Sequence, residues 1–125
     1  MIQKVAIIAL LAALGGVARY LLTGLVQQSA GGAFPWGTLF VNCLGCLLFG
    51  FVWSLADERM LISGTTRLLI LVGFFGSFTT FSTFAFETGQ LIRDSEWLFA
   101  AGNLIVQNVI GILAVFTGIA LGRAI

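Results

Sequence analysis

The fold of this chain is decided by the stretch Gly73-Phe74-Phe75-Gly76-Ser77-Phe78-Thr79-Thr80-Phe81-Ser82-Thr83-Phe84. It lies inside a long apolar segment, where a lipid bilayer normally requires an unbroken helix. Two glycines come first, and five hydroxyl side chains follow the second glycine. Glycine and hydroxyl residues allow a membrane helix to open, because they let the freed backbone groups find new partners. The stretch therefore predicts a membrane helix that is interrupted between about Gly76 and Thr80.

An interruption of this kind can bind ions. Freed carbonyl oxygens in a membrane hold cations, and freed N–H groups or hydroxyls hold anions. Phenylalanines recur at every third position from Phe75 to Phe84, and this spacing predicts four rings near one side of a helical segment. A simpler interpretation is a close helix–helix contact made from small residues. Plain packing explains five hydroxyls and four phenylalanines in one stretch poorly.

The composition is that of an integral membrane protein. Of the 125 residues, 59% are hydrophobic and 9% are charged, whereas a soluble domain has about 25% charged residues. Each membrane span needs about 20 apolar residues, so the length accommodates four spans and no separate soluble domain. The net charge of +1 gives no sign of nucleic-acid binding, and the lack of histidine excludes metal sites built on imidazole.

We expect an all-α fold with a single four-span membrane domain over residues 1–125. Its spans are predicted at about residues 3–26, 37–56, 66–92 and 97–121. The connection at 93–96 is short, so spans three and four are predicted to be antiparallel neighbours. No signal peptide is expected, because the apolar run continues far beyond the usual length and no clear cleavage site follows it. The protein is expected to be a multi-pass protein of the plasma (inner) membrane.

Several polar residues interrupt the spans. Arg19 is a functional candidate by default, although it can also snorkel to the near interface. Asn42 belongs to a stripe of small and polar residues with Thr38, Gly45 and Cys46, and it either bonds a neighbouring helix or faces a wet pathway. Glu87 lies either at the membrane surface or at the mouth of a pathway, and the second interpretation is favoured. Cys43 and Cys46 share a helix face and are interpreted as buried packing residues, because a redox pair needs an accessible polar site.

The fourth span is polar in its first half, with Asn103, Gln107 and Asn108, and small-faced in its second half. Polar stripes on spans two, three and four need partner surfaces, and a homodimer is the simplest solution. Orientation follows from lysine and arginine in the connections. Four basic residues, Lys4, Arg59, Arg67 and Arg123, lie on the side of the termini, and only Arg93 lies opposite. This favours cytoplasmic termini.

Two motifs together resemble those of the Fluc (CrcB) family of fluoride channels. They are Gly37-Thr38-Leu39-x-x-Asn42-x-x-Gly45 and Gly73-x-x-Gly76-x-x-Thr79-Thr80-Phe81-Ser82-Thr83-Phe84. The four-span length and the placement of Arg19-Tyr20 and Glu87 agree with the resemblance, which covers essentially the whole chain.

The resemblance implies an antiparallel, dual-topology homodimer with two separate fluoride pores. It implies that the third helix breaks at its middle and that backbone carbonyls of Gly76 and Thr79 hold a structural sodium ion at the dimer centre. It assigns Phe81 and Phe84 to the pore walls, and Arg19 and Glu87 to the aqueous vestibules. The polar pore-lining positions it implies are Thr38, Asn42, Ser82 and Thr83. Such a channel is not an enzyme; it lets cytoplasmic fluoride leave the cell.

This sequence departs from the family pattern in two ways. The fourth helix of the family usually carries a hydroxyl track beyond its polar half, but Ile112 and Phe116 stand near the expected positions, with Thr117 one residue further. The four-to-one distribution of basic residues is less balanced than dual topology favours, which leaves room for a heteromeric pair.

Two other functions fit the sequence less well. A small dimeric multidrug exporter needs an acidic residue deep in its first span, whereas the first span here contains Arg19 and no carboxylate. A non-transporting subunit of a membrane assembly would show no ion flux on its own. Soluble enzyme chemistry has no support, because the sequence contains neither a nucleophile–base pair nor a phosphate-binding loop.

Overall fold

The computed structural model describes residues 1–125, and the chain is entirely helical apart from short connections. Four helical spans are long and apolar enough to cross a membrane. Three of them are single helices: α1 (Ile2–Ala30), α2 (Trp36–Asp57) and α6 (Trp97–Ala124). The remaining span, Gly64–Arg93, is assembled from several shorter helical pieces. The helices run a few residues beyond the predicted spans, because regular helix continues past the apolar stretch.

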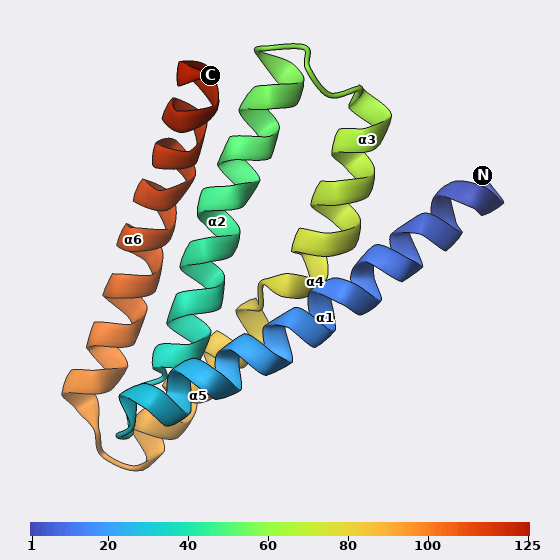
Figure 1. Ribbon diagram of the computed structural model, residues 1–125. Helices are drawn as coiled ribbons and strands as arrows, with labels where there is room; N and C mark the ends of the chain where they lie inside the picture. Colours follow the sequence, from blue (N-terminus) through green and yellow to red (C-terminus); the bar gives the residue numbers. More distant parts are fainter.

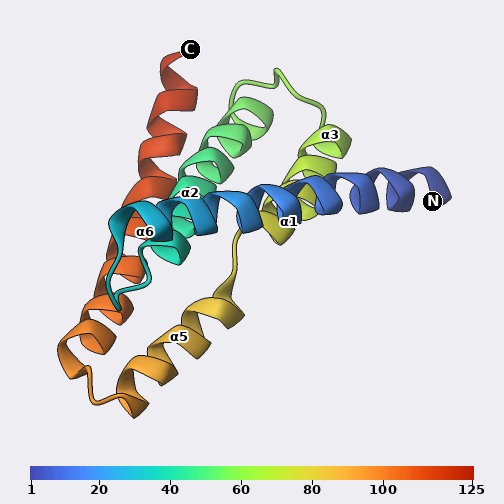
Figure 2. The ribbon, with the colours of Figure 1, turned by 60° about the horizontal axis from the view of Figure 1, so that its bottom comes forward.

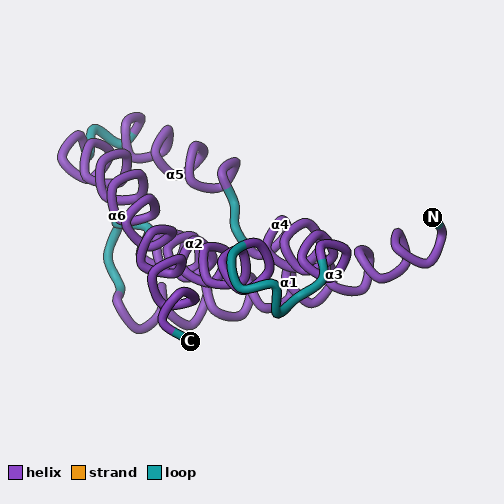
Figure 3. Tube along the Cα trace, turned by 90° about the horizontal axis from the view of Figure 1, so that it is seen from above, coloured by secondary structure: helices purple, strands orange, loops and turns teal.

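The third span consists of α3 (Gly64–Leu68), the π-helical segment η1 (Leu69–Phe75), α4 (Gly76–Phe78) and α5 (Phe81–Arg93). Between α4 and α5 the backbone is extended, with ψ of 159° at Thr79 and φ of −149° at Thr80. Figures 2 and 3 show this link between α4 and α5, where the span changes direction. The prediction of a break between Gly76 and Thr80 is confirmed.

The break separates the four phenylalanines that the sequence placed on one side. Phe75 and Phe78 are buried beside Phe74 in an aromatic cluster, whereas Phe81 is 79% exposed and pairs with Phe84. The prediction that all four rings lie near one side of a helical segment is therefore wrong. A spacing of three residues keeps side chains together only while the helix continues, and the extended backbone at Thr79 and Thr80 ends it.

Small residues bring α2 and α6 together along most of their length (Figure 1). Gly50 lies against the backbone of Val115, and Gly118 lies against the backbone of Leu47. Without a strong hydrophobic force between helices in lipid, close backbone approach is a main source of helix association. The prediction that spans three and four are neighbours holds only for α5, because α2 lies beside α6 elsewhere.

The first helix crosses the other half of the third span. Gly15 of α1 approaches the backbone of Phe74, and the hydroxyl of Ser77 donates to the carbonyl of Ala12 at 2.8 Å. The N-terminal part of α1 extends away from the other helices (Figure 1), and its side chains before Ile8 are exposed. The two halves of the broken span are thus held by different partners: α1 holds η1 and α4, and α6 holds α5.

Ion pairs close the end of the bundle that carries the C-terminus. Arg123 pairs with Glu58 through two hydrogen bonds, one of them 2.6 Å from Nε to Oε2. Arg67 pairs with Asp57 at 2.7 Å and lies over the ring of Trp53. The hydrogen bond from Arg123 lowers the pKa of the Glu58 carboxyl below its ordinary value.

This lowered pKa predicts an acid-sensitive contact between α2 and α6. A carboxyl group whose pKa is lower in the folded state stabilises that state above its unfolded pKa, and the stabilisation is lost as pH falls through the folded value. We expect thermal unfolding of the wild type in detergent to shift downward on acidification below about pH 4. Glu58→Gln should show a smaller shift, and equal shifts in the two proteins would contradict a stabilising role for the pair.

Candidate functional site

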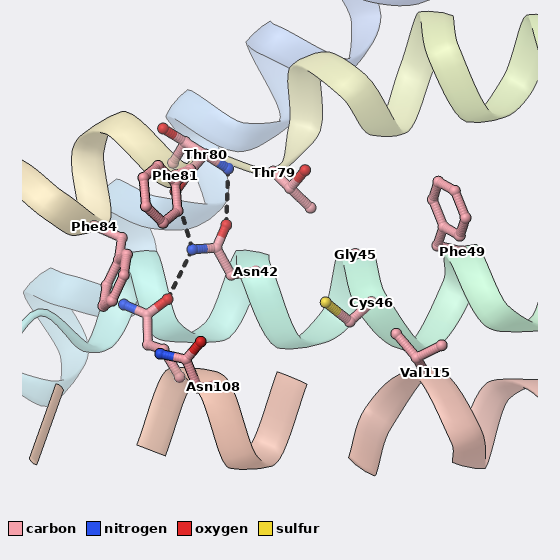
Figure 4. Close-up of a pocket in the computed structure, with 11 residues that line it drawn as sticks. Asn42, Gly45, Cys46, Phe49, Thr79, Thr80, Phe81, Phe84, Asn108 and Val115 are labelled. Atoms are coloured by element: carbon pink, nitrogen blue, oxygen red, sulfur yellow. Dashed lines mark hydrogen bonds between the residues drawn. The ribbon is translucent and has the colours of Figure 1, made fainter. Parts of the chain in front are cut away.

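A cavity of about 290 Å³ lies inside the membrane-spanning region, where α2, the break and α6 meet (Figure 4). Its wall combines neutral polar side chains with aromatic rings, and it contains no charged residue. The lining residues are Asn42, Gly45, Cys46, Phe49, Thr79, Thr80, Phe81, Phe84, Gln107, Asn108 and Val115.

The carboxamide of Asn42 satisfies the backbone of the break. Its Oδ1 accepts from the N–H of Thr80 at 2.8 Å, and its Nδ2 donates to the carbonyl of Thr80 at 3.1 Å. Extended backbone is tolerated at membrane depth only where protein groups or water replace the lost helical bonds. Of the two alternatives left open by the sequence, bonding to a neighbour and facing a pathway, Asn42 has the geometry for both, because it also lines the cavity.

The hydroxyl cluster starts α5. Thr80 is the N-cap residue, and its side chain accepts from the N–H of Thr83 at 3.1 Å. The Thr80 hydroxyl donates to Oγ1 of Thr83 at 2.9 Å and lies 3.4 Å from the hydroxyl of Ser82. Threonine and serine are favoured at this position because a side-chain oxygen replaces a missing helical acceptor. Ser82 and Thr83, both predicted as pore-lining, lie beside the cavity lining rather than in it.

Two carbonyl groups at the break lack their helical donors. In a continuous helix the N–H of Thr80 would bond the carbonyl of Gly76, and the N–H of Thr83 would bond the carbonyl of Thr79. Here these N–H groups are donated to Asn42 and to the Thr80 side chain. Gly45 of α2 lies directly against the side chain of Thr79, so no larger residue fits there. The residues predicted for a cation thus present carbonyl oxygens without their usual helical partners.

The two rings predicted for the pore wall lie on the first turn of α5. The ring centroids of Phe81 and Phe84 are 5.7 Å apart, and their planes are inclined by 60°. Phe84 is buried, whereas Phe81 is largely exposed in the single chain. Figure 4 shows both rings beside Asn42 and the amide side chains of α6. Asn42, Phe81 and Phe84 line the same cavity, and their assignment to an ion pathway stays a prediction.

Three carboxamides of α6 contribute to this region, although the sequence predicts only that the first half of this span is polar. Gln107 Oε1 accepts from Asn42 Nδ2 at 2.7 Å. Gln107 Nε2 donates to Asn103 Oδ1 at 2.9 Å, and Asn103 Nδ2 donates to the hydroxyl of Thr88 at 2.9 Å. Asn108 also lines the cavity. The spacing of four between Asn103 and Gln107 places both on one helix face and was the available signal.

A second cavity of about 430 Å³ lies at the end of the bundle that carries the α1–α2 and α5–α6 connections. Glu87 is among its lining residues, and one oxygen of this carboxylate accepts from the Thr38 hydroxyl at 2.8 Å. The other oxygen is buried without a hydrogen-bond partner. Thr38 therefore lies with Glu87 rather than in the first cavity. Arg19 is half-buried, forms no ion pair and lines neither cavity.

The comparison with protein-family models gives one match over residues 6–119, to the model described as "CrcB-like protein, Camphor Resistance (CrcB)". The chain belongs to the CrcB family. Its membership confirms the resemblance drawn from the two motifs, and the four apolar spans make this CrcB protein a multi-pass membrane protein.

Similar proteins match this CrcB chain over nearly its entire length. A protein of Nitrosococcus oceani named "Fluoride-specific ion channel FluC" is 57% identical over 123 residues, which cover 98% of each chain. Proteins with the same name from Solidesulfovibrio magneticus and Desulforapulum autotrophicum are 51% and 50% identical, over 100% and 98% of each chain.

Proposed function

We propose that the protein is a fluoride-selective ion channel that lets cytoplasmic fluoride leave the cell down its electrochemical gradient. The observation that carries this proposal is the uncharged cavity at the break, lined by Asn42, Phe81 and Phe84 inside the membrane-spanning region. The names of the similar proteins point to the same ion. A channel moves its ion without bond chemistry, so the protein is not an enzyme.

Neutral donors suit conduction of a small, strongly hydrated anion. The pathway must replace the water around fluoride, but a fixed positive charge would hold the ion too tightly to release it. Both N–H bonds of Asn42 already have acceptors, Thr80 and Gln107. Fluoride that reaches Asn42 must share an N–H with one of these two acceptors or displace that acceptor, which keeps fluoride binding weak. We assign Asn42 to the pathway, and the nearby hydroxyls of Ser82 and Thr83 to its continuation along α5.

The phenyl rings supply a second kind of contact. The edge of an aromatic ring carries partial positive charge, whereas its face is negative. Phe81 and Phe84 are assigned to the wall, where ring edges meet the ion and the ring volume narrows the passage. Chloride is excluded by its size and by its poorer match to closely placed donors. The second cavity, lined in part by Glu87, is assigned to an aqueous vestibule, and Thr38 donates to this carboxylate without lining the cavity. The resemblance assigns Arg19 to a vestibule as well.

The functional unit is an antiparallel homodimer with two pores. A single chain leaves Phe81 79% exposed on a cavity whose wall contains carboxamides. Polar groups that face hydrocarbon are costly, so this surface needs a protein partner. A second copy in the inverted orientation supplies the missing wall for each pore. The orientation bias from Lys4, Arg59, Arg67 and Arg123 is too small to prevent insertion in both directions.

The carbonyls of Gly76 and Thr79 are assigned to a structural sodium ion at the dimer centre. Carbonyl oxygen is a hard ligand that suits this cation, and the normal helical donors of both carbonyls are bonded elsewhere. Two carbonyls from each copy would surround the ion, whose charge would link the two breaks and favour anions nearby.

Removal of sodium should therefore destabilise the dimer. A ligand that binds only the folded state at a hundredfold excess over its dissociation constant stabilises that state by about 2.7 kcal/mol. We expect a lower thermal unfolding midpoint when sodium is replaced by N-methyl-D-glucamine at constant ionic strength. Potassium at the same concentration serves as the control for cation identity. A midpoint independent of sodium concentration would contradict the assignment.

The proposed function is tested with the purified protein in liposomes loaded with fluoride or with chloride. Fast release of fluoride and retention of chloride are expected. Release of neither ion would favour a missing partner subunit or a non-transporting assembly protein. The multidrug exporter receives no support, because α1 contains no carboxylate to exchange protons for organic cations.

A further inference from the structure

Gln107 occupies a connecting position between α6 and the break. It is 8% exposed, and both ends of its carboxamide are used: Oε1 accepts from Asn42, and Nε2 donates to Asn103. Asn103 is fully buried and donates in turn to the hydroxyl of Thr88 on α5. Carboxamides buried in a membrane protein are tolerated only when their hydrogen bonds are made, so this set of residues forms a connected network.

The network runs in one direction. The N–H of Thr80 donates to Asn42, Asn42 to Gln107, Gln107 to Asn103, Asn103 to Thr88, and the Thr88 hydroxyl to the carbonyl of Phe84 at 2.8 Å. Groups bonded in series polarise one another and strengthen each bond by roughly 10–30%. When Gln107 accepts from Asn42 Nδ2, the Asn42 oxygen becomes a better acceptor for the Thr80 N–H.

Both ends of the network lie on the same short piece of chain. It begins at the N–H of Thr80 and ends at the carbonyl of Phe84, and these groups bracket the turn of α5 that carries Phe81 and Phe84. The remaining packing of α5 is mainly against α6, because its contact with α2 is slight. The network therefore fixes the first turn of α5 relative to α2 and α6.

We propose that Gln107 is a positioning residue of the ion pathway, which acts through Asn42 to hold the first turn of α5 and its two rings in place. This inference depends on the proposed function only where ion flux is the measurement. Gln107 itself need not meet the ion. Its role is to keep Asn42 aligned with the break while the ion competes for the same amide.

The test compares wild type with Gln107→Met, which keeps a similar side-chain length and removes both hydrogen bonds. We expect hydrogen exchange of the ¹⁵N-labelled Asn42 side-chain amide to become about tenfold faster, which corresponds to the loss of one buried hydrogen bond. Fluoride release from liposomes should fall by a similar factor. Ser29→Ala is the control, because the Ser29 hydroxyl bonds only to the carbonyl of Leu25 of its own helix and lines neither cavity. It should leave both measurements unchanged.

The outcomes separate this inference from the proposed function. Unchanged Asn42 exchange in an assembled Gln107→Met protein would overturn the inference, whether or not the wild type conducts fluoride. Faster exchange with unchanged flux would also overturn it, because Asn42 would then be loosened without consequence for conduction. If Gln107→Met fails to assemble, the test uses Asn103→Leu instead. This substitution removes the hydrogen bonds of Asn103, which lie one residue further along the network from Asn42. That variant should accelerate Asn42 exchange by a smaller factor, and no acceleration would contradict the proposal.

Discussion

Asn42→Asp is expected to reduce fluoride release by about a hundredfold or more. The Asn42 amide donates to the Thr80 carbonyl and to Gln107 Oε1, so an aspartate would place its oxygen against two acceptors. A buried donor replaced by an unpaired acceptor costs about 1–3 kcal/mol, and about 2.7 kcal/mol corresponds to a hundredfold change in rate. An ionised aspartate would in addition repel the anion. Fluoride-electrode measurements on liposomes containing the variant give the rate directly.

Gln28→Glu serves as the control for this substitution. It also replaces an amide by a carboxylate, but Gln28 is an exposed residue near the end of α1 and lines neither cavity. Its fluoride release should match that of the wild type. Undiminished release from an assembled Asn42→Asp protein, with the carboxylate ionised, would count against a place for Asn42 in the pathway.

Phe81→Ile is expected to lower fluoride release by more than about tenfold, that is, to raise the barrier by about 1.4 kcal/mol. Isoleucine keeps an apolar side chain but has no ring edge of partial positive charge. The protein should still assemble, because isoleucine keeps an apolar surface where the exposed Phe81 ring lies. Fluoride release is measured as for Asn42→Asp, and assembly is checked by size-exclusion chromatography in detergent.

A matched control for the loss of an exposed ring is available on α5 itself. Phe86 is 65% exposed and lines neither cavity, so Phe86→Ile removes another largely exposed ring, outside the proposed pathway. It should conduct at the wild-type rate. Equal losses in Phe81→Ile and Phe86→Ile would show that exposed rings matter for assembly or lipid contact rather than for the ion.

The spans and the break were predictable because their signals are strong. Hydrophobicity summed over about 20 residues identifies a membrane helix, and the glycines and hydroxyls after Gly73 mark where it opens. The pairing of α2 with α6 was not predictable from connection lengths. A short connection such as residues 94–96 fixes only the adjacent helix ends, whereas the close contacts of Gly50 and Gly118 decide the longer interface.

Part of the site was visible in the sequence and part was not. The motifs pointed to Asn42, Phe81 and Phe84, which line one cavity, but a periodic stripe does not specify a bonding partner. The bond from the Thr80 N–H to Asn42 therefore came from the structure alone. Gln107 and Asn103 were recognised as polar, yet their role requires knowledge of which helix α6 faces. The spacing of the four phenylalanines predicted rings near one side of a helical segment, whereas the extended backbone at Thr79 and Thr80 divides them into two pairs.

The central claim is tested most directly by fluoride efflux from liposomes that contain only this purified protein, followed with an ion-selective electrode and compared with chloride efflux. We predict fast fluoride release and no chloride release above that of protein-free liposomes. Release of chloride at a comparable rate, or no fluoride release from the properly assembled protein, would contradict a self-sufficient fluoride channel.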